Sequence, residues 1–451
     1  MDAPTTSHAP AASNQPVTLP PAPGGFRIFS LPVLSWAMYD FANTIFSFAV
    51  ITRYFNEWVI EQNGRPDWHV GLMSFIVGIV LLTAMPAMGA ISDQLGRRLP
   101  FLAAFTLACV AATGVIGAVD SVTVALVVAG LAIFCYQLAL SMYDPLLATV
   151  APPAAHGRVS GLGVGLGYVG VLVGSLVLTA LVPEDDYQAA FLPTALMFLV
   201  FALPIFLFVR ERGPRGSRPD RHVVRAAMRQ VVTTVSHIRD EHRATGRFLI
   251  ARFLYVDAIA TVIAFMTVYM DRVGSFSEGD RTLVLGLAMI AAAIGGFVAG
   301  SLVERFGPRA VLRGILIIAA ITLVVAGVSG SATLVWVLGP AVGITLGGVW
   351  TSDRVFMLRL SPPAVRGEFF GIYNLIGKLS SGFGPLVLWG GTVWLLHSRS
   401  GWSELAASRA ALVVLAAAVL AGLWVLWPLS DEPRYEDHDF LGDPEGAGAG
   451  A

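Results

Sequence analysis

Ionisable side chains interrupt the apolar runs of this sequence at several points, where burial in hydrocarbon makes a charge costly. Such groups usually face a cavity or a charged partner, and they mark the functional parts of a membrane protein. With the polar and aromatic residues that accompany them, they form a set of candidate substrate-binding or coupling residues. The set consists of Asp40, Asn43, Asp144, Arg252, Asp257, Asp353, Arg354, Tyr373, Asn374 and Lys378.

The lysine of this set stands alone, because every other Lys or Arg position of the chain is an arginine. Lys378 lies about 11 residues into its apolar run, roughly 16 Å at the helical rise, and shares a stripe with Asn374 and Ser381. An ammonium beside neutral hydrogen-bonding groups suits a carboxylate, a phosphate or another anionic head on a substrate. The alternatives are an ion pair with Asp257, which substrate or a proton must release, and a purely structural counter-charge.

A ten-residue segment between two apolar runs recurs in altered form later in the chain. Gly89–Arg98 reads GAISDQLGRR, and Gly300–Arg309 reads GSLVERFGPR. A repeated connection of this kind indicates a duplicated membrane half, and two such halves enclose a central cavity for a solute. The residues expected to act in a conformational switch are Gly89, Asp93, Gly96, Arg97, Arg98, Glu304 and Arg309.

The elements that must position these residues are membrane helices. Hydrophobic residues make up 55% and charged residues 13% of the 451 positions, which excludes a water-soluble globule. A spanning helix needs about 20 mainly apolar residues. Twelve runs meet this need and predict an all-α membrane protein of two pseudo-symmetric six-helix bundles: 33–59, 69–92, 99–118, 122–150, 158–182, 188–209, 247–270, 281–303, 310–328, 332–360, 367–396 and 405–428.

The distribution of arginine predicts the orientation of these spans. Connections that follow even-numbered spans carry arginines such as Arg97, Arg98 and Arg158, whereas the opposite connections are poor in cations or balanced by acids. The positive-inside rule therefore predicts that these connections and both termini are cytoplasmic. We expect a multi-pass protein of the cell (inner) membrane.

The chain divides into five predicted regions. They are a disordered cytoplasmic tail (1–32), an N-terminal bundle (33–209), a basic cytoplasmic linker (210–246), a C-terminal bundle (247–428) and an acidic, Gly/Ala-rich cytoplasmic tail (429–451). In the linker, apolar residues recur at helical spacing on a face that lacks the arginines, as in an amphipathic helix on an anionic membrane surface. A solvated basic tether is the alternative interpretation.

Several functional classes are disfavoured. A net charge of −1 provides no general attraction for nucleic acid. Cys109 and Cys135 lie within apolar runs, which suits small core residues better than a disulfide or a metal site. Because no histidine falls in mid-membrane and no nucleotide-binding motif is visible, we expect no enzyme activity and no metal or cofactor. The expected partners are a small-molecule solute and the lipid bilayer, and we expect a monomer.

Several segments resemble a known family. The Gly-x-x-x-Asp-x-x-Gly-Arg-Arg pattern at 89–98 is similar to the signature loop of the Major Facilitator Superfamily. Segments 36–43, 157–168 and 367–378 resemble its vacuole-effluxer-like branch, which is related to the autophagy-linked vacuolar amino-acid exporter, and the likeness covers roughly 33–428. It implies two six-helix bundles, with spans 1, 4, 7 and 10 around a central path, and transport by rocking without ATP. Span 10 departs from the branch, since Trp350, Asp353 and Val355 replace polar neighbours of Arg354.

The predicted function is secondary active transport of a small polar solute, an amino acid or another anionic metabolite, in the direction of efflux. Asp40, Asp144 or Asp257 could supply proton coupling. Two other functions fit the same fold. One is a lipid or lysolipid flippase, and the other is a membrane receptor or assembly factor that has lost transport.

Two geometric expectations follow. Asp93 should lie near the N-terminus of span 11 and pair with Arg97 or another nearby arginine, because a carboxylate is favoured at the positive end of a helix dipole. Glu304 should be a weaker counterpart. Asp40, Asp144, Arg252 and Arg354 should form a layer of opposite charges, about 9–12 Å deep from the cytoplasmic ends, that closes the cavity on that side.

Overall fold

The computed structural model describes residues 26–66, 68–183, 186–211, 242–274 and 276–430. Within these residues the regular structure is helical, with no strand. The predicted basic linker, apart from its two ends, and most of both predicted tails lie outside the described residues. The all-α fold predicted from the apolar runs is confirmed.

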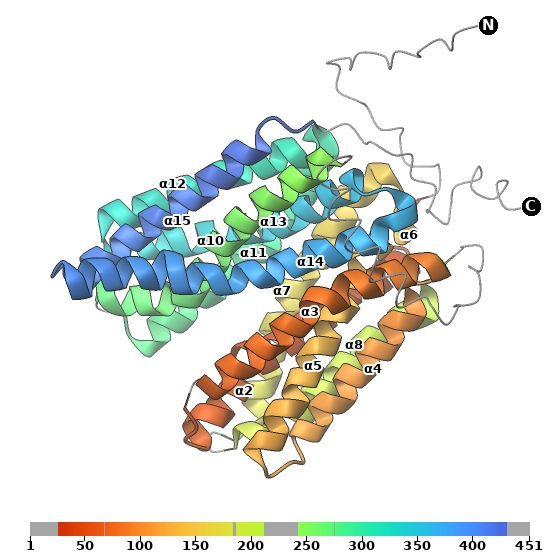
Figure 1. The fold of residues 1–451 in the computed structure, drawn as a ribbon, viewed down its shortest axis with the longest axis horizontal. Helices are drawn as coiled ribbons and strands as arrows, with labels where there is room; N and C mark the ends of the chain where they lie inside the picture. The colour runs from red at the N-terminus through yellow and green to blue at the C-terminus, as the bar shows by residue number, and fades with distance from the viewer. Residues whose placement is uncertain (1–25, 67, 184–185, 212–241, 275, 431–451) are drawn as a thin grey trace, which may run out of the picture.

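Two groups of helices make up the two halves of the molecule (Figure 1). The first half contains α1 (Leu31–Phe46), α3 (Trp68–Leu95), α4 (Leu99–Ile116), α5 (Val122–Tyr143), α7 (His156–Leu181) and α8 (Phe191–Phe208). The second half contains α10 (Arg243–Val273), α11 (Glu278–Phe306), α12 (Pro308–Ser329), α13 (Ala332–Leu360), α14 (Arg366–Phe383) and α15 (Glu404–Leu426). Among the described residues, eleven helical segments are long and apolar enough to cross a membrane.

The first predicted span is divided rather than continuous. After α1, the chain forms π-helical turns in η1 (Ser47–Thr52) and η2 (Trp58–Gln62), with the short helix α2 (Tyr54–Glu57) between them. Side chains contact carbonyl groups at this irregular stretch, as in the 3.1 Å hydrogen bond that Asn56 Nδ2 donates to the Ile51 carbonyl. Apolar periodicity does not register such a change of helix type, which is why 33–59 reads as one run.

The eleventh span is divided in the same way. It passes from α14 into the π-helical segments η7 (Gly384–Gly391) and η8 (Trp394–Arg399). At the junction, the Gly384 N–H donates a 2.6 Å hydrogen bond to Asp257 Oδ1 of α10. The predicted continuous run 367–396 therefore missed an irregularity at which a charged side chain contacts the backbone.

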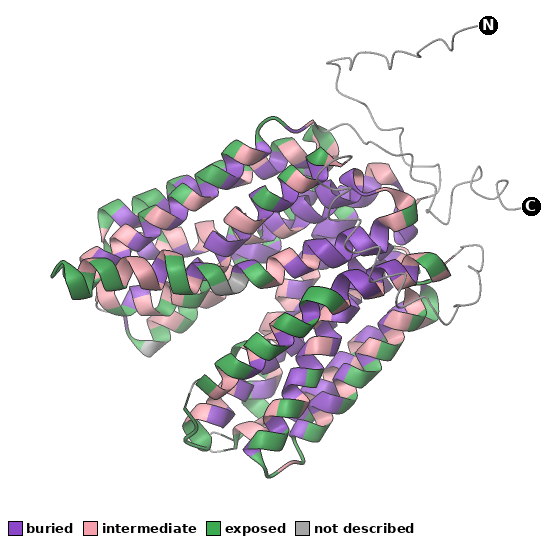
Figure 2. Cartoon of the chain, viewed as in Figure 1, coloured by how far each residue is buried: buried purple, intermediate pink, exposed green. Residues whose placement is uncertain are grey.

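The halves contact each other where the signature loops lie, and we call this the loop end. There α3 packs against α14, and α7 packs against α11. Both contacts depend on glycine, because a Cβ at Gly89 would lie 2.3 Å from the Gly367 carbonyl oxygen and one at Gly157 would lie 2.5 Å from that of Gly300. Buried residues gather in this region, and the helices of the two halves diverge toward the other, splayed end (Figure 2).

Candidate functional site

An arginine of the second half bridges two acids of the first half. Arg354 of α13 places its Nη1 3.0 Å from Asp40 Oδ2 of α1. Its Nε lies 3.1 Å from Oδ1 of Asp144, which begins the 3₁₀ turn η3 (Asp144–Leu146) after α5. All three side chains are buried. One guanidinium therefore joins three helices across the division between the halves, and we call this contact the Arg354 bridge.

Asn374 of α14 completes the contact on the second-half side. Its Nδ2 donates a 2.9 Å hydrogen bond to Asp144 Oδ2. Both oxygens of the Asp144 carboxylate are consequently held by groups of the opposite half, Arg354 on one and Asn374 on the other. Any movement that separates the halves at this point removes both partners.

Two aromatic residues of the first half frame the Arg354 bridge. Trp36 and Tyr143 stack with ring centroids 4.8 Å apart and lock together, because the Tyr143 hydroxyl donates a 3.0 Å hydrogen bond to the Trp36 carbonyl. The guanidinium carbon of Arg354 lies 5.3 Å and 5.7 Å from the Trp36 and Tyr143 ring centroids. Such distances fit cation–π attraction. The aromatic pair thus joins α1 to α5 and also contacts the guanidinium of Arg354.

A glycine of α7 makes room for this arrangement. A Cβ at Gly163 would lie 2.7 Å from the Trp36 ring and 2.8 Å from Asp40 Oδ2. Since Trp36 and Asp40 are one helical turn apart, both face the same side of α1 and both need this space. Gly163 and Tyr143 are not among the candidate residues predicted from the sequence, because nothing in their neighbouring sequence distinguishes them from packing residues.

The expected charge layer is wrong for Arg252. In the described part of the chain this residue pairs with no acid of the first half, and its Nε lies 3.1 Å from Asp353 Oδ2 within its own half. Tyr373 completes the group, donating from its hydroxyl to Asp353 Oδ1 at 2.8 Å and accepting from Arg252 Nη1 at its carbonyl at 3.0 Å. Because successive residues point about 100° apart on a helix, Asp353 faces α10 while Arg354 faces the other half.

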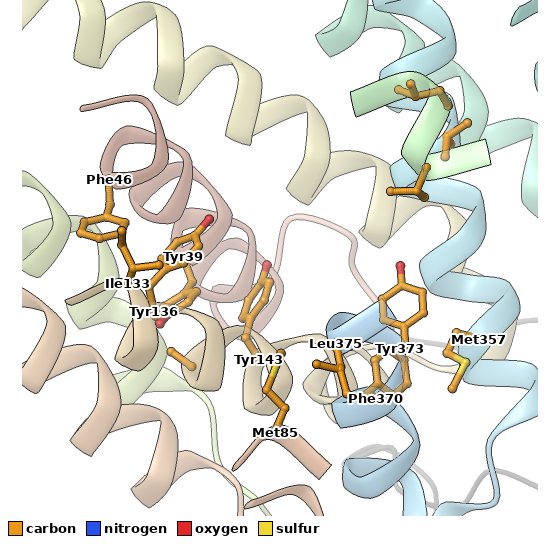
Figure 3. Packing of buried hydrophobic residues seen from close by; sticks show 14 of the residues in the cluster. Tyr39, Phe46, Met85, Ile133, Tyr136, Tyr143, Met357, Phe370, Tyr373 and Leu375 are labelled. Atoms are coloured by element: carbon orange, nitrogen blue, oxygen red, sulfur yellow. The ribbon is translucent and has the colours of Figure 1, made fainter. Parts of the chain in front are cut away.

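Figure 3 shows one tyrosine from each half in this region. Tyr143 and Tyr373 stand on opposite sides of the contact between the halves, with their hydroxyl groups pointing the same way and Leu375 between them. The Tyr373 ring also covers Arg252, whose guanidinium carbon lies 3.7 Å from the ring centroid. Arg252 and Arg354 are therefore each held by carboxylate and aromatic groups together.

Asp93 lies where the signature loop predicted. Its Oδ1 and Oδ2 each accept a 2.9 Å hydrogen bond from the backbone N–H groups of Gly367 and Glu368 in the first turn of α14. The arginine that pairs with it is Arg98, at 2.9 Å, whereas Arg97 is exposed. Gly96 has a positive φ of 62°, which ends α3 and turns the chain toward Arg98.

Glu304 forms the corresponding contact in the other copy of the repeat. It accepts a 3.1 Å hydrogen bond from the Arg158 N–H in the first turn of α7 and pairs with Arg158 Nε at 2.5 Å. The Glu304 and Arg158 side chains are 18% and 48% exposed, against 4% for Asp93. Glu304 thus accepts fewer backbone hydrogen bonds than Asp93 and is more exposed to solvent. Arg309 instead donates to the Leu429 carbonyl, just beyond α15.

A further acid at the loop end is not among the residues predicted from the sequence. Glu211 follows α8 and accepts hydrogen bonds of 2.8 to 2.9 Å from the backbone N–H groups of Arg98 and Leu99. It therefore caps the N-terminus of α4. Because Glu211 lies in the predicted linker rather than in a predicted span, the search for charged residues within the spans does not identify it.

The other candidates lie closer to the splayed end. Asp257 is buried and bound to the backbone of span 11 at Gly384. Lys378 is half-buried on α14, one turn beyond Asn374, whose side chain faces the first half. Asn43 of α1 is buried, and its Oδ1 has no hydrogen-bond partner in the described structure. These residues do not form part of the Arg354 bridge.

Comparisons with known proteins identify relatives of this chain. A family profile described as Major Facilitator Superfamily matches residues 28–385 and 248–441. The uncharacterized MFS-type transporter YxiO of Bacillus subtilis is 27% identical over 374 residues, which are 78% of this chain and 86% of the relative. Autophagy-related protein 22-1 of Penicillium rubens is 26% identical over 263 residues, 51% of this chain and 43% of the fungal protein.

Solved structures share the fold. The human organic anion transporter MFSD10 superposes with a TM-score of 0.67 at 16% identity, covering 88% of this chain and 98% of its own. A bacterial homologue of the iron transporter ferroportin, in an outward-facing state, reaches a TM-score of 0.66 at 16% identity, covering 89% and 98%. At these identities the likeness concerns the arrangement of the helices.

Proposed function

Since the chain belongs to the Major Facilitator Superfamily, we propose that it is a secondary active transporter that exports a small polar solute by alternating access. The observation that carries this proposal is the Arg354 bridge, in which a cation of one half holds two acids of the other at 3.0 Å and 3.1 Å. Ion pairs between halves can form in one state and break in another. The bridge and the glycine contacts close the loop end, while the helices diverge at the splayed end.

The loop end is placed on the cytoplasmic side of the cell (inner) membrane in this proposal. Support comes from the arginines of its connections, among them Arg97, Arg98 and Arg158. With the loop end closed, the described state opens away from the cytoplasm. The likeness to the effluxer branch favours export, with a monomer as the transporting unit.

Lys378 is the residue that we assign to the substrate. It is half-buried and lies one helical turn after Asn374, on the face of α14 that contacts the first half. It also lies farther from the loop end than the Arg354 bridge does. An ammonium in this position suits a carboxylate or another anionic head. Amino acids and small organic acids are the solute classes that present such a group.

Transport into proteoliposomes tests the assignment, with a panel of labelled amino acids and small carboxylates as probes. Lys378→Gln should weaken binding of the transported probe by at least tenfold, the equivalent of about 1.4 kcal/mol. Asp257→Asn should affect binding less, because Asp257 already contacts the Gly384 N–H. Wild-type transport by Lys378→Ala would overturn the role of the lysine.

The ion-pair alternative gives a different pattern in the same assay. If Lys378 and Asp257 form a coupling pair, each single neutral variant should fail at uphill transport, and the double variant should recover passive exchange. Failure of every probe with well-folded wild-type protein, with and without a pH gradient, would count against the transport proposal itself.

A further inference from the structure

The two acids of the Arg354 bridge depend on the opposite half for their charged partner. Asp40 and Asp144 belong to the first half, and the arginine that pairs with both belongs to the second. The hydrogen bond on the other oxygen of Asp144 also comes from the second half, through Asn374. Separation of the halves at the loop end would therefore leave two neighbouring carboxylates without their cation.

Two buried acids of the second half, Asp353 and Asp257, are arranged differently. Asp353 is held by Arg252 and Tyr373, and Asp257 by the Gly384 N–H, all within one half. Rocking of the halves as rigid bodies leaves these contacts intact.

Asp93 keeps Arg98 of its own half, and Glu304 is partly exposed. Asp40 and Asp144 are therefore the buried acids that lose their cation when the loop end parts.

A carboxylate that loses a neighbouring cation binds a proton more readily. Two like charges close together strengthen this tendency, since both cannot remain ionised at low cost. We propose that Asp40 and Asp144 form a proton-binding site that is empty while Arg354 bridges them and takes up a proton when the halves part at the loop end. This inference rests on the proposed alternating access.

The sign of the pH effect follows from this arrangement. Arg354 favours the ionised acids in the bridged state, so proton binding and parting of the loop end favour each other. Arg252 and Asp353 neutralise each other beside the bridge, and Lys378 lies one turn farther along α14. The titratable and charged groups that surround the site are Tyr39 and Asp40 on α1, Tyr136, Tyr143 and Asp144 on or just after α5, Tyr168 on α7, Arg252 on α10, Asp353 and Arg354 on α13, and Tyr373 and Lys378 on α14.

Distance measurements between spin labels test the proposal with the proton as the only ligand. In a background in which Cys109 and Cys135 are replaced by alanine, labels at Arg97→Cys and Ala310→Cys report the loop end, since both positions are exposed on different halves. Arg65→Cys and Ser400→Cys report the splayed end in the same way. In nanodiscs without solute, lowering the pH should lengthen the loop-end distance and shorten the other. For one proton the ratio of the two states should change by at most about tenfold per pH unit.

The decisive comparison is the double variant Asp40→Asn/Asp144→Asn, which mimics the protonated pair. It should favour the parted loop end at neutral pH and lose the pH response, while Asp257→Asn, the matched control, should retain it. The proposed proton site would be overturned if the spin-label distances of the wild-type protein did not change with pH, or if the double variant responded to pH like the wild type. If transport of a probe persists in that case, the transport proposal stands. If no condition or probe moves either distance, alternating access itself fails.

Discussion

At the scale of single residues, the site depends as much on missing side chains as on charged ones. Gly163 leaves space for both Trp36 and Asp40, and Gly377 lies so close to Arg252 that a Cβ would meet its Nη1 at 2.6 Å. A charged group can stay in its bonded position only where the neighbouring helix leaves room. These glycines therefore set the geometry of the ion pairs without contributing a functional group.

Gly163→Ala should disturb the Arg354 bridge. The added methyl group would meet Asp40 Oδ2 at 2.8 Å and the Trp36 ring at 2.7 Å, so one of them must move. Overpacking of this kind costs about 1–3 kcal/mol, which should shift the protein toward a parted loop end and slow transport. Labelling of a cysteine at the loop end measures the shift. Gly286→Ala is the control, since nothing lies within 4 Å of its Cβ, and equal labelling of both variants would contradict this account.

At the scale of helices, the two copies of the repeat hold the halves together with unequal strength. Asp93 accepts two backbone hydrogen bonds from α14 and pairs with Arg98 in a buried setting. Glu304 accepts one from α7 and pairs with an arginine that is 48% exposed. Buried charge-assisted hydrogen bonds are stronger than exposed pairs, so the α3–α14 contact should be the firmer of the two.

Neutral variants of the two acids should reveal this difference. Asp93→Asn should weaken the α3–α14 contact by roughly 1.5–3 kcal/mol, because it removes charge-assisted hydrogen bonds. Glu304→Gln should weaken the α7–α11 contact by at most about 1 kcal/mol. The measurement is the initial rate of transport in proteoliposomes, with protein amounts matched by size-exclusion chromatography. The rate should fall by tenfold or more for Asp93→Asn, and the fall should be several times smaller for Glu304→Gln. A larger effect of Glu304→Gln would reverse the assigned order.

At the scale of the whole molecule, the duplicated halves carry opposite charges at matching positions. Asp144 precedes the Pro152-Pro153 pair by the same number of residues as Arg354 precedes Pro362-Pro363. The duplication thus brings a carboxylate and a guanidinium to equivalent places on α5 and α13, where they meet at 3.1 Å. Arg252, by contrast, serves the interior of its own half.

Alanine substitution of the two arginines should separate these roles. Arg354→Ala leaves Asp40 and Asp144 buried without their cation, at a cost of about 3–5 kcal/mol that the protein can relieve by parting the loop end. Arg252→Ala leaves Asp353 unpaired within one bundle, so it should lower the melting temperature with little change in the loop-end distance. Spin-label distances and thermal unfolding together check both outcomes. A fall in melting temperature without a change in distance for Arg354→Ala would contradict the bridging role.

The sequence by itself determined the elements and the candidate residues. Apolar runs located the spans, the repeated segments revealed the two halves, and the placement of Asp93 at the start of span 11 followed from helix electrostatics. These inferences succeed because hydropathy and periodicity are local properties of the chain. The π-helical breaks at Ser47 and Gly384 were missed, since they change the helix without changing its apolar character.

Only the tertiary structure decided which charges meet. The sequence placed Arg252 and Arg354 at one depth, but the rotation of α13 turns Arg354 toward Asp40 and Asp144 and turns Asp353 toward Arg252. Partner choice depends on the relative rotation and spacing of helices far apart in the chain, and packing sets both. Gly163 and Tyr143 gained their importance in the same way, from what lies opposite them rather than from what lies beside them in the sequence.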